Sequence, residues 1–288
     1  MANFDKRVPE SVEGDFFVDS TCIDCDTCRQ VAPGVFAEGD GHAFVHSQPQ
    51  EPTSRRRALQ ALLACPTGSI GTRGTEKPRS AFADFPLPIE EPVFYCGFNS
   101  PKSYGGNSYF VRHPEGNWLI DSPKFLPRLV KRFEELGGIE NIFLTHSDDV
   151  ADAALYAERF GARRIIHRDE LHSQPGAELV LEGIEPIALV PEFIAIPTPG
   201  HTKGHCTLLF RERFLFTGDH LAWDRHAEHL VAFREYCWHS WRQQAGSMAR
   251  LEAFSFEWVL PGHGQRVHLP REVMRQQMAR LSQSMARE

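Results

Sequence analysis

The sequence predicts an α/β protein with a small α+β domain at its N-terminus, followed by a layered α/β domain that takes up most of the chain. Four of the seven cysteines fall within residues 16–70, and short apolar strands alternate with helical patterns from Phe94 onward. Between these regions, residues 71–93 contain four prolines without a sustained period, which is typical of a linker. We therefore expect domains at 1–72 and 94–288, joined by a linker at 73–93.

The second domain is expected to open with two paired strands, NSYFVRH and GNWLIDS, around a turn at 113–117. Helices are expected at 126–136 and in DVADAALYAERFG, each ended by glycine. A longer helix at 236–254 would pack Trp238 and Trp241 into the core. Further strands are expected at IENIFLTH, ARRIIHR, FIAIPT, CTLLFRE, RFLFTGD and FEWVLP.

The last stretch of the sequence predicts a helix that docks on the sheet. Its apolar side chains recur at helical spacing, as Val273, Met274, Met278, Leu281 and Met285.

Composition argues against two kinds of partner. Lys and Arg number 31 and Asp and Glu 38, a net charge of −7, whereas a nucleic-acid binder needs a basic face. No run approaches the roughly 18 apolar residues of a membrane span. The start of the chain lacks an apolar stretch after a basic region, so no secretory signal is expected. We therefore expect a cytoplasmic protein that binds neither nucleic acid nor membrane, with thiols that are buried or hold metal.

The first cysteines, Cys22, Cys25 and Cys28, form a C-x-x-C-x-x-C pattern, and Cys65 follows much later, directly before Pro66. Thiolates three residues apart on a tight loop can each bind one iron of an inorganic cube, and a remote Cys-Pro step can supply the fourth ligand. Structural zinc usually takes two separated cysteine pairs, and buried free thiols rarely repeat at strict threes. The pattern therefore favours one 4Fe–4S cluster over both alternatives.

Residues 16–72, with VDSTCIDCDTCRQVAPGVF and ALLACPTGSI, resemble the single-cluster 4Fe–4S ferredoxins. The resemblance implies a ferredoxin-like domain. Asp24 and Asp26 lie between the expected ligands, and we expect their charge to make the cluster harder to reduce.

Several expected strands of the second domain end on residues that commonly bind metals. Each follows an apolar run, so each side chain should emerge at the rim of a buried sheet. Imidazoles and carboxylates that converge there make a site suited to zinc, iron or manganese. The residues are His146 and Asp148, His201, Asp219 and His220, and His263.

The motifs LTHSDD, PTPGHTKGH, LFTGDHL and LPGHG resemble those of the metallo-β-lactamase superfamily, in the family's order. The resemblance covers roughly residues 94–265. It implies an αβ/βα sandwich with metals at the edge where the two sheets meet.

The first motif departs from the family pattern H-x-H-x-D-H, which supplies two ligands to each of two metals. Aligned on His146, the second His position holds Asp148, and the last two positions hold Val150 and Ala151. The resemblance implies a first site made by His146, His201, Asp219 and Asp148.

The implied second site keeps only the bridging Asp219 and His263, unless Asp149 or Asp152 substitutes. We therefore expect one divalent metal, zinc or iron, with a second metal weak or absent. Thr145 is expected to hold the metal loop by hydrogen bonds, and His205 to have a supporting or surface role.

Three functions are compatible with these patterns. The first is a metal-dependent hydrolase of a small ester, thioester, lactone or phosphoester, in which Asp148 or Asp149 orients water and His220 or His263 assists the leaving group. The second is a redox enzyme or sensor that passes electrons from the cluster to a non-haem metal. This hypothesis draws on a resemblance to flavodiiron proteins, which carry a carboxylate at the position of Asp148, and it implies a redox partner protein. The third is a non-catalytic electron carrier.

Overall fold

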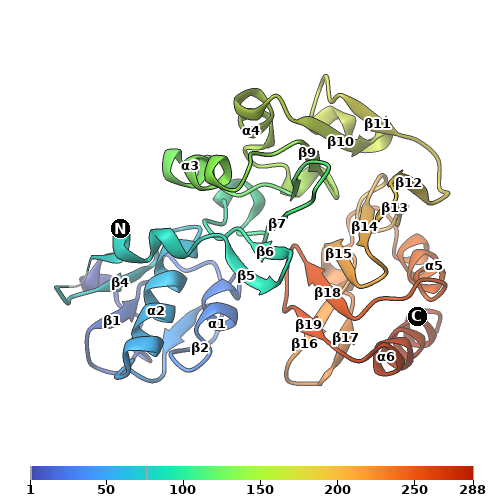
Figure 1. The fold of residues 1–288 in the computed structure, drawn as a ribbon. Helices are drawn as coiled ribbons and strands as arrows, with labels where there is room; N and C mark the ends of the chain where they lie inside the picture. The colour runs from blue at the N-terminus through green and yellow to red at the C-terminus, as the bar shows by residue number, and fades with distance from the viewer. Residues whose placement is uncertain (1, 76, 288) are drawn as a thin grey trace. The chain divides into compact units, whose positions relative to one another are not determined.

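The computed structural model describes residues 2–75 and 77–287 (Figure 1). The chain forms two compact units. Unit 1 is formed by Met1–Asn117 and Ser122–Gly138, and unit 2 by Trp118–Asp121 and Ile139–Glu288. The described residues leave out three positions, Met1, Glu76 and Glu288. These positions fall in the expected first domain, linker and second domain, respectively.

Unit 1 begins with the part of the chain that carries the cysteine pattern. Its helix α2 starts with Pro52, whose fixed φ suits the first helical turn, and stops at Cys65, since the residue before Pro66 avoids helical backbone. Strands β1 and β4 pair antiparallel, and β2 and β3 form a hairpin. The elements are η1 (Phe4–Lys6), β1 (Phe16–Val18), α1 (Thr27–Val31), β2 (Phe36–Glu38), β3 (Ala43–Val45), α2 (Pro52–Ala64) and β4 (Ile70–Thr72).

Regular structure also occupies much of the stretch expected as a linker. Phe85 is completely buried and its ring lies 4.7 Å from that of Phe98, while Arg56 of α2 pairs with Asp84. These contacts anchor the segment within unit 1, although the domain limits themselves stay a prediction. The elements that follow β4 in this unit are η2 (Pro78–Asp84), the antiparallel strands β5 (Leu87–Glu90), β6 (Val93–Tyr95) and β7 (Tyr109–Val111), η3 (Pro101–Ser103) and α3 (Pro127–Glu135).

Unit 2 contains two sheets that face each other. In the first, β8 to β11 run parallel, and helix α4 crosses from β9 to β10. The rings of Trp118 on β8 and Phe193 on β13 stack at 4.2 Å, which joins the two sheets in one core. The first sheet and its helices comprise β8 (Trp118–Ile120), β9 (Asn141–Phe143), η4 (Ser147–Asp149), α4 (Ala153–Phe160), β10 (Arg163–His167), η5 (Arg168–Ser173) and β11 (Leu179–Leu181).

The second sheet has the order β12-β13-β14-β15-β18-β19 and is antiparallel except for the pair β15 and β18. Layers of helix, sheet, sheet and helix give the mixed α/β sandwich that the resemblance implies. The elements are β12 (Ile187–Val190), β13 (Phe193–Pro197), β14 (Cys206–Phe210), β15 (Phe214–Gly218), β16 (Ala222–Asp224), β17 (His229–Val231), η6 (Arg234–Tyr236), α5 (Trp241–Leu251), β18 (Trp258–Pro261), β19 (Val267–His268) and α6 (Arg271–Met285).

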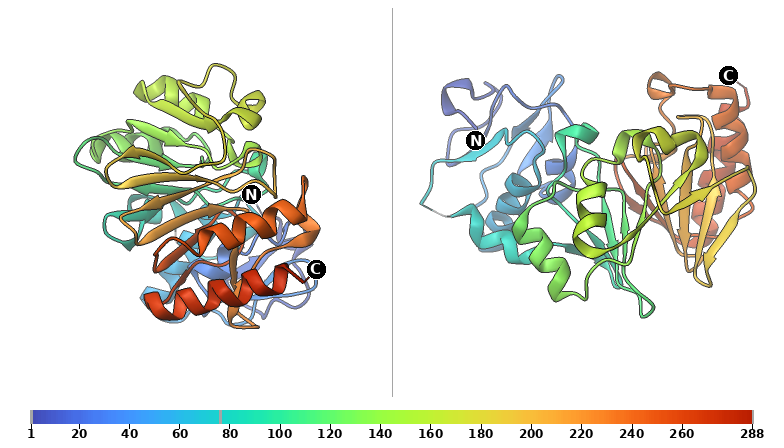
Figure 2. Two further views of the ribbon diagram at one scale, coloured as in Figure 1. Left: turned by 90° about the vertical axis from the view of Figure 1, so that its right-hand side faces the viewer. Right: turned by 90° about the horizontal axis from the view of Figure 1, so that it is seen from above.

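Helices α5 and α6 lie side by side against the second sheet (Figure 2). The expected terminal helix is confirmed, and four of the five residues of its apolar stripe are buried, whereas Val273 is 39% exposed. The expected start of the helix at 236–254 is wrong. Ser240 caps α5 by accepting a hydrogen bond from the Gln243 amide, so Trp238 lies in the loop before the helix.

None of the described helices is both long and apolar enough to cross a membrane.

Candidate metal centres

Four cysteine side chains of unit 1 line one small cavity, as the sequence pattern predicts. Cys22 and Cys25 lie on the loop before α1, Cys28 lies on α1, and Cys65 follows the end of α2. None of the four forms a disulfide. Burial raises the pKa of the Cys22 and Cys28 thiols and that of Cys25 to about 11, so a metal must displace their protons on binding. Four convergent, buried sulfurs fit an iron–sulfur cluster.

Two backbone amides donate hydrogen bonds to the cysteine sulfurs, as suits a bound iron–sulfur cluster. The Ala43 amide donates to Sγ of Cys22 at 3.4 Å, and the Ser69 amide donates to Sγ of Cys65 at 3.3 Å. Such hydrogen bonds to sulfur are among the features that set the potential of a bound cluster.

The loop between the cysteines is held by a buried cation. Asp24 and Asp26 have positive φ angles of 56° and 62°, which curl the loop. Arg29, only 5% exposed, donates to Oδ1 of Asp26 at 2.6 Å and to Asp24. One guanidinium therefore offsets one of the two negative charges that the sequence places beside the cluster.

A second segment of unit 1 covers this pocket. A Cβ added to Gly105 would lie 2.8 Å from Cβ of Cys25 and 3.0 Å from Pro66. Nδ2 of Asn99 donates to Thr27 Oγ1 at 2.9 Å and to the Gly105 carbonyl at 2.7 Å. The segment 99–105 is thus fixed against the cysteine loop, and no sequence signal pointed to it.

The second candidate centre lies in unit 2, where several strands end. His146 follows β9, His201 follows β13, Asp219 follows β15 and His263 follows β18. The short helix η4 turns the chain directly after His146 and carries Asp148 and Asp149. The fold thus brings together the residues that the sequence motifs singled out.

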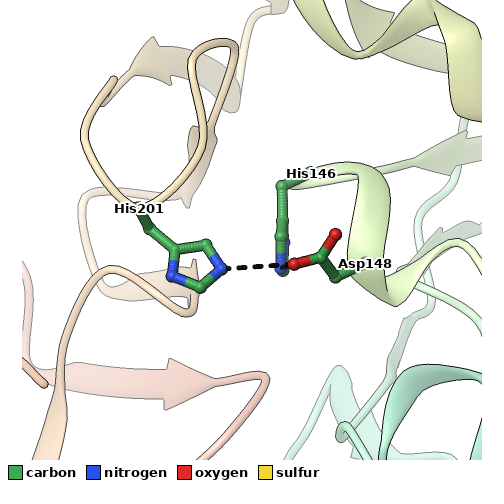
Figure 3. A group of neighbouring side chains, drawn as sticks. All are labelled: His146, Asp148 and His201. Atoms are coloured by element: carbon green, nitrogen blue, oxygen red, sulfur yellow. Dashed lines mark ion pairs between the residues drawn. The ribbon is translucent and has the colours of Figure 1, made fainter. Parts of the chain in front are cut away.

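Three of these side chains converge on one point (Figure 3). Nε2 of His201 lies 3.6 Å from Oδ2 of Asp148, and Nε2 of His146 lies 4.0 Å from the same oxygen. Oδ2 of Asp219 lies 3.6 Å from Nε2 of His201 and 3.7 Å from Nε2 of His146. We call His146, Asp148, His201 and Asp219 the first ligand group.

The charges of the first ligand group are mutually dependent. The imidazole of His201, 3.6 Å away, and the imidazole of His146 hold the pKa of the Asp148 carboxyl well below its usual range. Burial lowers the pKa of His201, but the carboxylates of Asp148 and Asp219 outweigh burial and raise it. Burial raises the pKa of Asp219, yet the neighbouring histidines outweigh that effect and lower it.

The strongest evidence for a bound cation is that several buried polar atoms of the first ligand group have no hydrogen-bond partner among the described residues. His146 Nε2, His201 Nε2 and Asp219 Oδ1 are buried without a hydrogen-bond partner among the described residues. Unpaired buried polar atoms are rare and costly unless an ion satisfies them. Two imidazole nitrogens with carboxylate oxygens fit a divalent transition metal such as zinc or iron.

A second group of donors lies beside the first. Asp149 is 1% exposed, neither of its carboxylate oxygens has a hydrogen-bond partner, and Oδ1 lies 3.7 Å from Nε2 of His263. A Cβ on Gly262 would meet Oδ2 of Asp149 at 2.4 Å and Oδ1 of Asp219 at 2.9 Å, so only glycine leaves room there for both oxygens. We call Asp149, His263 and Asp219 the second ligand group.

Hydrogen bonds behind the ligands hold their loops. Thr145 Oγ1 lies 2.9 Å from His146 Nδ1, and the Thr145 amide donates to the buried Asp121 carboxylate at 2.9 Å, which confirms the expected role of Thr145. Burial and the nearby Asp149 carboxylate raise the pKa of Asp121.

Glu170 of η5 is a support that the sequence did not reveal. It is 2% exposed, and its two carboxylate oxygens accept the amides of Ser147 at 3.1 Å and Gly204 at 2.6 Å. One buried side chain thereby ties the loop of His146 to the loop of His201. A lone glutamate in RDELHS carried no motif that could have predicted this.

His205 and His220 are both completely buried. His205 Nε2 accepts the Asp219 amide at 3.3 Å, so Nδ1 carries the proton and donates to Thr198 Oγ1 at 2.9 Å. Burial lowers the pKa of both imidazoles, that of His220 to about 3. Neither ring nitrogen of His220 has a hydrogen-bond partner among the described residues, and its catalytic role stays a prediction.

Family comparisons agree with the two centres. Residues 103–263 match the model described as the metallo-beta-lactamase superfamily. Residues 18–72 match the model of the 4Fe-4S single cluster domain of ferredoxin I. The chain thus combines an iron–sulfur domain with a fold whose members bind divalent metals.

Similar proteins extend the comparison. A hydroxyacylglutathione hydrolase of Acidiphilium cryptum (strain JF-5) is 32% identical over 118 residues, which make up 40% of this chain and 48% of that protein. The match therefore spans about half of that relative. Among solved structures, DIM-1 metallo-beta-lactamase aligns with a TM-score of 0.53 at 16% identity, over 68% of this chain and 95% of that one. The BLEG-1 B3 metallo-beta-lactamase aligns with a TM-score of 0.51 at 16% identity, over 63% and 96%. These structures share the fold.

Proposed function

Because this chain belongs to the metallo-beta-lactamase superfamily, we propose that unit 2 is a metal-dependent hydrolase that cleaves a small thioester. The proposal rests on the first ligand group, in which the two buried imidazole nitrogens of His146 and His201 and the more exposed carboxylate oxygen of Asp148 lie within 4.8 Å of one another. The name of the hydroxyacylglutathione hydrolase supports a thioester over the ester, lactone or phosphoester that the fold also accommodates.

The protein's own residues supply the remaining parts of the reaction. A divalent cation in the first ligand group would lower the pKa of a water molecule toward neutrality and polarise the substrate carbonyl. Asp148 is the most open ligand, with 47% of its side chain exposed, so its carboxylate orients the attacking water from the solvent side. When no second cation occupies the second ligand group, His263, 28% exposed, assists the leaving thiolate as a proton donor.

Rigid loops make this arrangement catalytically useful. Glu170 and Thr145 fix the backbone on both sides of His146, so little reorganisation accompanies the reaction. The buried His205 holds the amide of Asp219, which keeps that carboxylate between the two ligand groups.

A thioesterase assay with matched variants tests the proposal. Thiol release from S-lactoylglutathione is measured with the full chain purified without air, and separately from S-acetyl thioesters. His146→Ala and His201→Ala should lower turnover by about a thousandfold or more, since the cation contributes several kcal/mol to the transition state. His172→Ala, at an exposed residue near the end of η5, is the control and should leave turnover unchanged. Full turnover in both ligand variants would exclude the hydrolase.

Redox chemistry is the second candidate function. It is favoured by Asp148, which makes the first ligand group rich in oxygen and suitable for iron, and by the iron–sulfur domain in the same chain. In this proposal a redox partner protein delivers electrons to the cluster, and unit 2 reduces a small acceptor.

Metal analysis and EPR of protein purified without air separate the candidates. About four irons per chain plus zinc supports hydrolysis, while additional iron outside the cluster supports redox chemistry. A unit 2 that binds no metal would leave only a non-catalytic electron carrier.

A further inference from the structure

Three aromatic side chains form a strip beside the candidate metal centre of unit 2. Phe233, Tyr236 and Trp238 lie on the segment between β17 and α5. The rings of Phe233 and Tyr236 are 6.2 Å apart at 69°, and those of Tyr236 and Trp238 are 6.2 Å apart at 74°. Both contacts are edge-to-face, the arrangement that aromatic rings prefer. We call these three residues the aromatic strip.

The strip is unusually open to solvent for its composition. Trp238 is 63% exposed and Tyr236 is 55% exposed, whereas Trp118 of the same unit is 1% exposed. The sequence predicted Trp238 in the core, and the cap at Ser240 places it outside. Adjacent exposed aromatic side chains commonly mark a surface that binds a ligand or another macromolecule.

One end of the strip is hydrogen-bonded to the loop of His201, and the other end lies near the loop of His263. At one end, the Trp238 and His239 amides donate to the His201 carbonyl at 2.9 and 3.0 Å, and the Trp238 ring lies 6.2 Å from the His201 ring. At the other end, a Cβ on Gly264, next to His263, would lie 3.5 Å from the Phe233 ring. A molecule that reaches the first ligand group from this side therefore contacts the strip.

We propose that the aromatic strip is a substrate subsite that binds a planar aromatic group carried by the acyl or leaving part of the substrate. An aromatic ring of the substrate can pack edge-to-face against the rings of the strip. It then gains electrostatic contacts between ring quadrupoles that an alkyl group of equal size lacks. The occupant is the substrate itself, because the strip is bonded to the loop of a metal ligand. This inference rests on the proposed hydrolase, whose substrate class it narrows.

Binding of two matched carboxylates tests the inference without requiring turnover. Benzoate and cyclohexanecarboxylate each present a carboxylate to the metal and a six-membered ring to the strip. Titration calorimetry is done on the metal-loaded full chain purified without air. The unmodified protein should bind benzoate about fivefold more tightly, the value of one aromatic contact.

Variants assign the preference to the strip. Trp238→Ala should abolish the fivefold preference, and Trp238→Phe should retain most of it because the ring remains. Leu155→Ala, an exposed apolar residue on α4, is the control and should change neither affinity. Metal content is measured for each variant. If Trp238→Ala binds less metal, the test depends on the ratio of the two carboxylate affinities in Trp238→Phe: a retained preference supports the subsite, and a lost preference overturns it.

The outcomes separate this inference from the proposed function. A benzoate preference that Trp238→Ala removes supports the subsite even if no thioester is hydrolysed. Equal binding of the two carboxylates overturns the subsite even if thioesters are cleaved. Concentration-dependent self-association in sedimentation velocity that Trp238→Ala removes would also overturn it, since the strip would then be an interface between copies of this chain.

Discussion

Nε2 of His263 lies 3.7 Å from Oδ1 of Asp149, and both oxygens of that buried carboxylate lack a hydrogen-bond partner among the described residues. The pair occupies the place where the sequence suggested that a second metal would be weak or absent. Asp149 gives the second ligand group a carboxylate. The family motif places its aspartate at the position of Val150, whereas in this structure η4 buries the carboxylate of the preceding residue, Asp149.

Replacing Asp149 should have opposite effects with and without metal. Asp149→Asn should remove about one divalent ion per chain beyond the cluster, because the neutral amide is a poor ligand. The metal-free protein should gain about 1–3 kcal/mol of stability, since a buried carboxylate near Asp121 and Asp219 loses its charge. Metal analysis after dialysis and thermal unfolding measure the two effects. Asp152→Asn is the control, and loss of metal there instead would contradict the assignment.

Removing Glu170 should weaken metal binding without touching a ligand. Glu170→Ala leaves the part-buried Ser147 amide and the buried Gly204 amide without this acceptor, so both ligand loops lose a support. Metal affinity should fall about 10–100-fold, as for other residues that orient ligands. Glu170→Gln keeps one acceptor and should recover part of the loss. Asp169→Ala removes the exposed pair with Lys203 and a 3.9 Å contact with His167 but no bond to a ligand loop amide, so it should change little. Equal losses in all three variants would contradict this role.

The candidate ligand residues could be identified from sequence because they lie shortly after the ends of apolar strands. His146 and Asp219 closely follow continuous apolar runs and His201 comes shortly after β13, so local pattern alone places them near a sheet rim. Glu170 and Asp121 were not predictable, since they act through backbone amides that only the tertiary fold brings near. Trp238 was misplaced for a local reason: the serine cap at 240 outweighs a helical pattern of apolar residues upstream.

The charge of Arg29 should control the potential of the bound cluster. Arg29→Gln removes the positive charge that pairs with Asp24 and Asp26 beside the cysteine loop, so reduction adds an electron to a more negative environment. The potential should fall by on the order of 60 mV, a tenfold change for a one-electron couple. Redox titration followed by EPR measures it. Arg29→Gln combined with Asp24→Asn restores the net charge and should restore the potential; an unchanged potential in the single variant would show that solvent screens these charges.

The pair of Arg164 and Glu178 should make stability depend on acid. The hydrogen bonds from Arg164 lower the pKa of Glu178 to about 2 from an ordinary value of 4.5. A carboxyl whose pKa is lower in the folded state stabilises the fold above its unfolded pKa, and that contribution disappears as the pH falls toward 2. Because Glu178 is exposed, Glu178→Gln should cost only about 1 kcal/mol at pH 7. Unfolding midpoints of both proteins should differ at pH 7 and converge near pH 2; a constant difference would assign the loss to packing.

Crowding at Gly105 should make it essential for the cluster. Its φ is +89°, and an added Cβ would lie 2.8 Å from Cβ of Cys25, so Gly105→Ala combines backbone strain with a shift of a cluster ligand. The variant should lose most of its iron and visible absorbance within a purification without air. Gly41→Ala is the matched control, because Gly41 also has a positive φ, +70°, but no atom lies within 4 Å of the added Cβ. That control should keep its iron despite a cost of about 1 kcal/mol. Equal iron loss in the two variants would mean that strain alone, rather than contact with Cys25, releases the cluster.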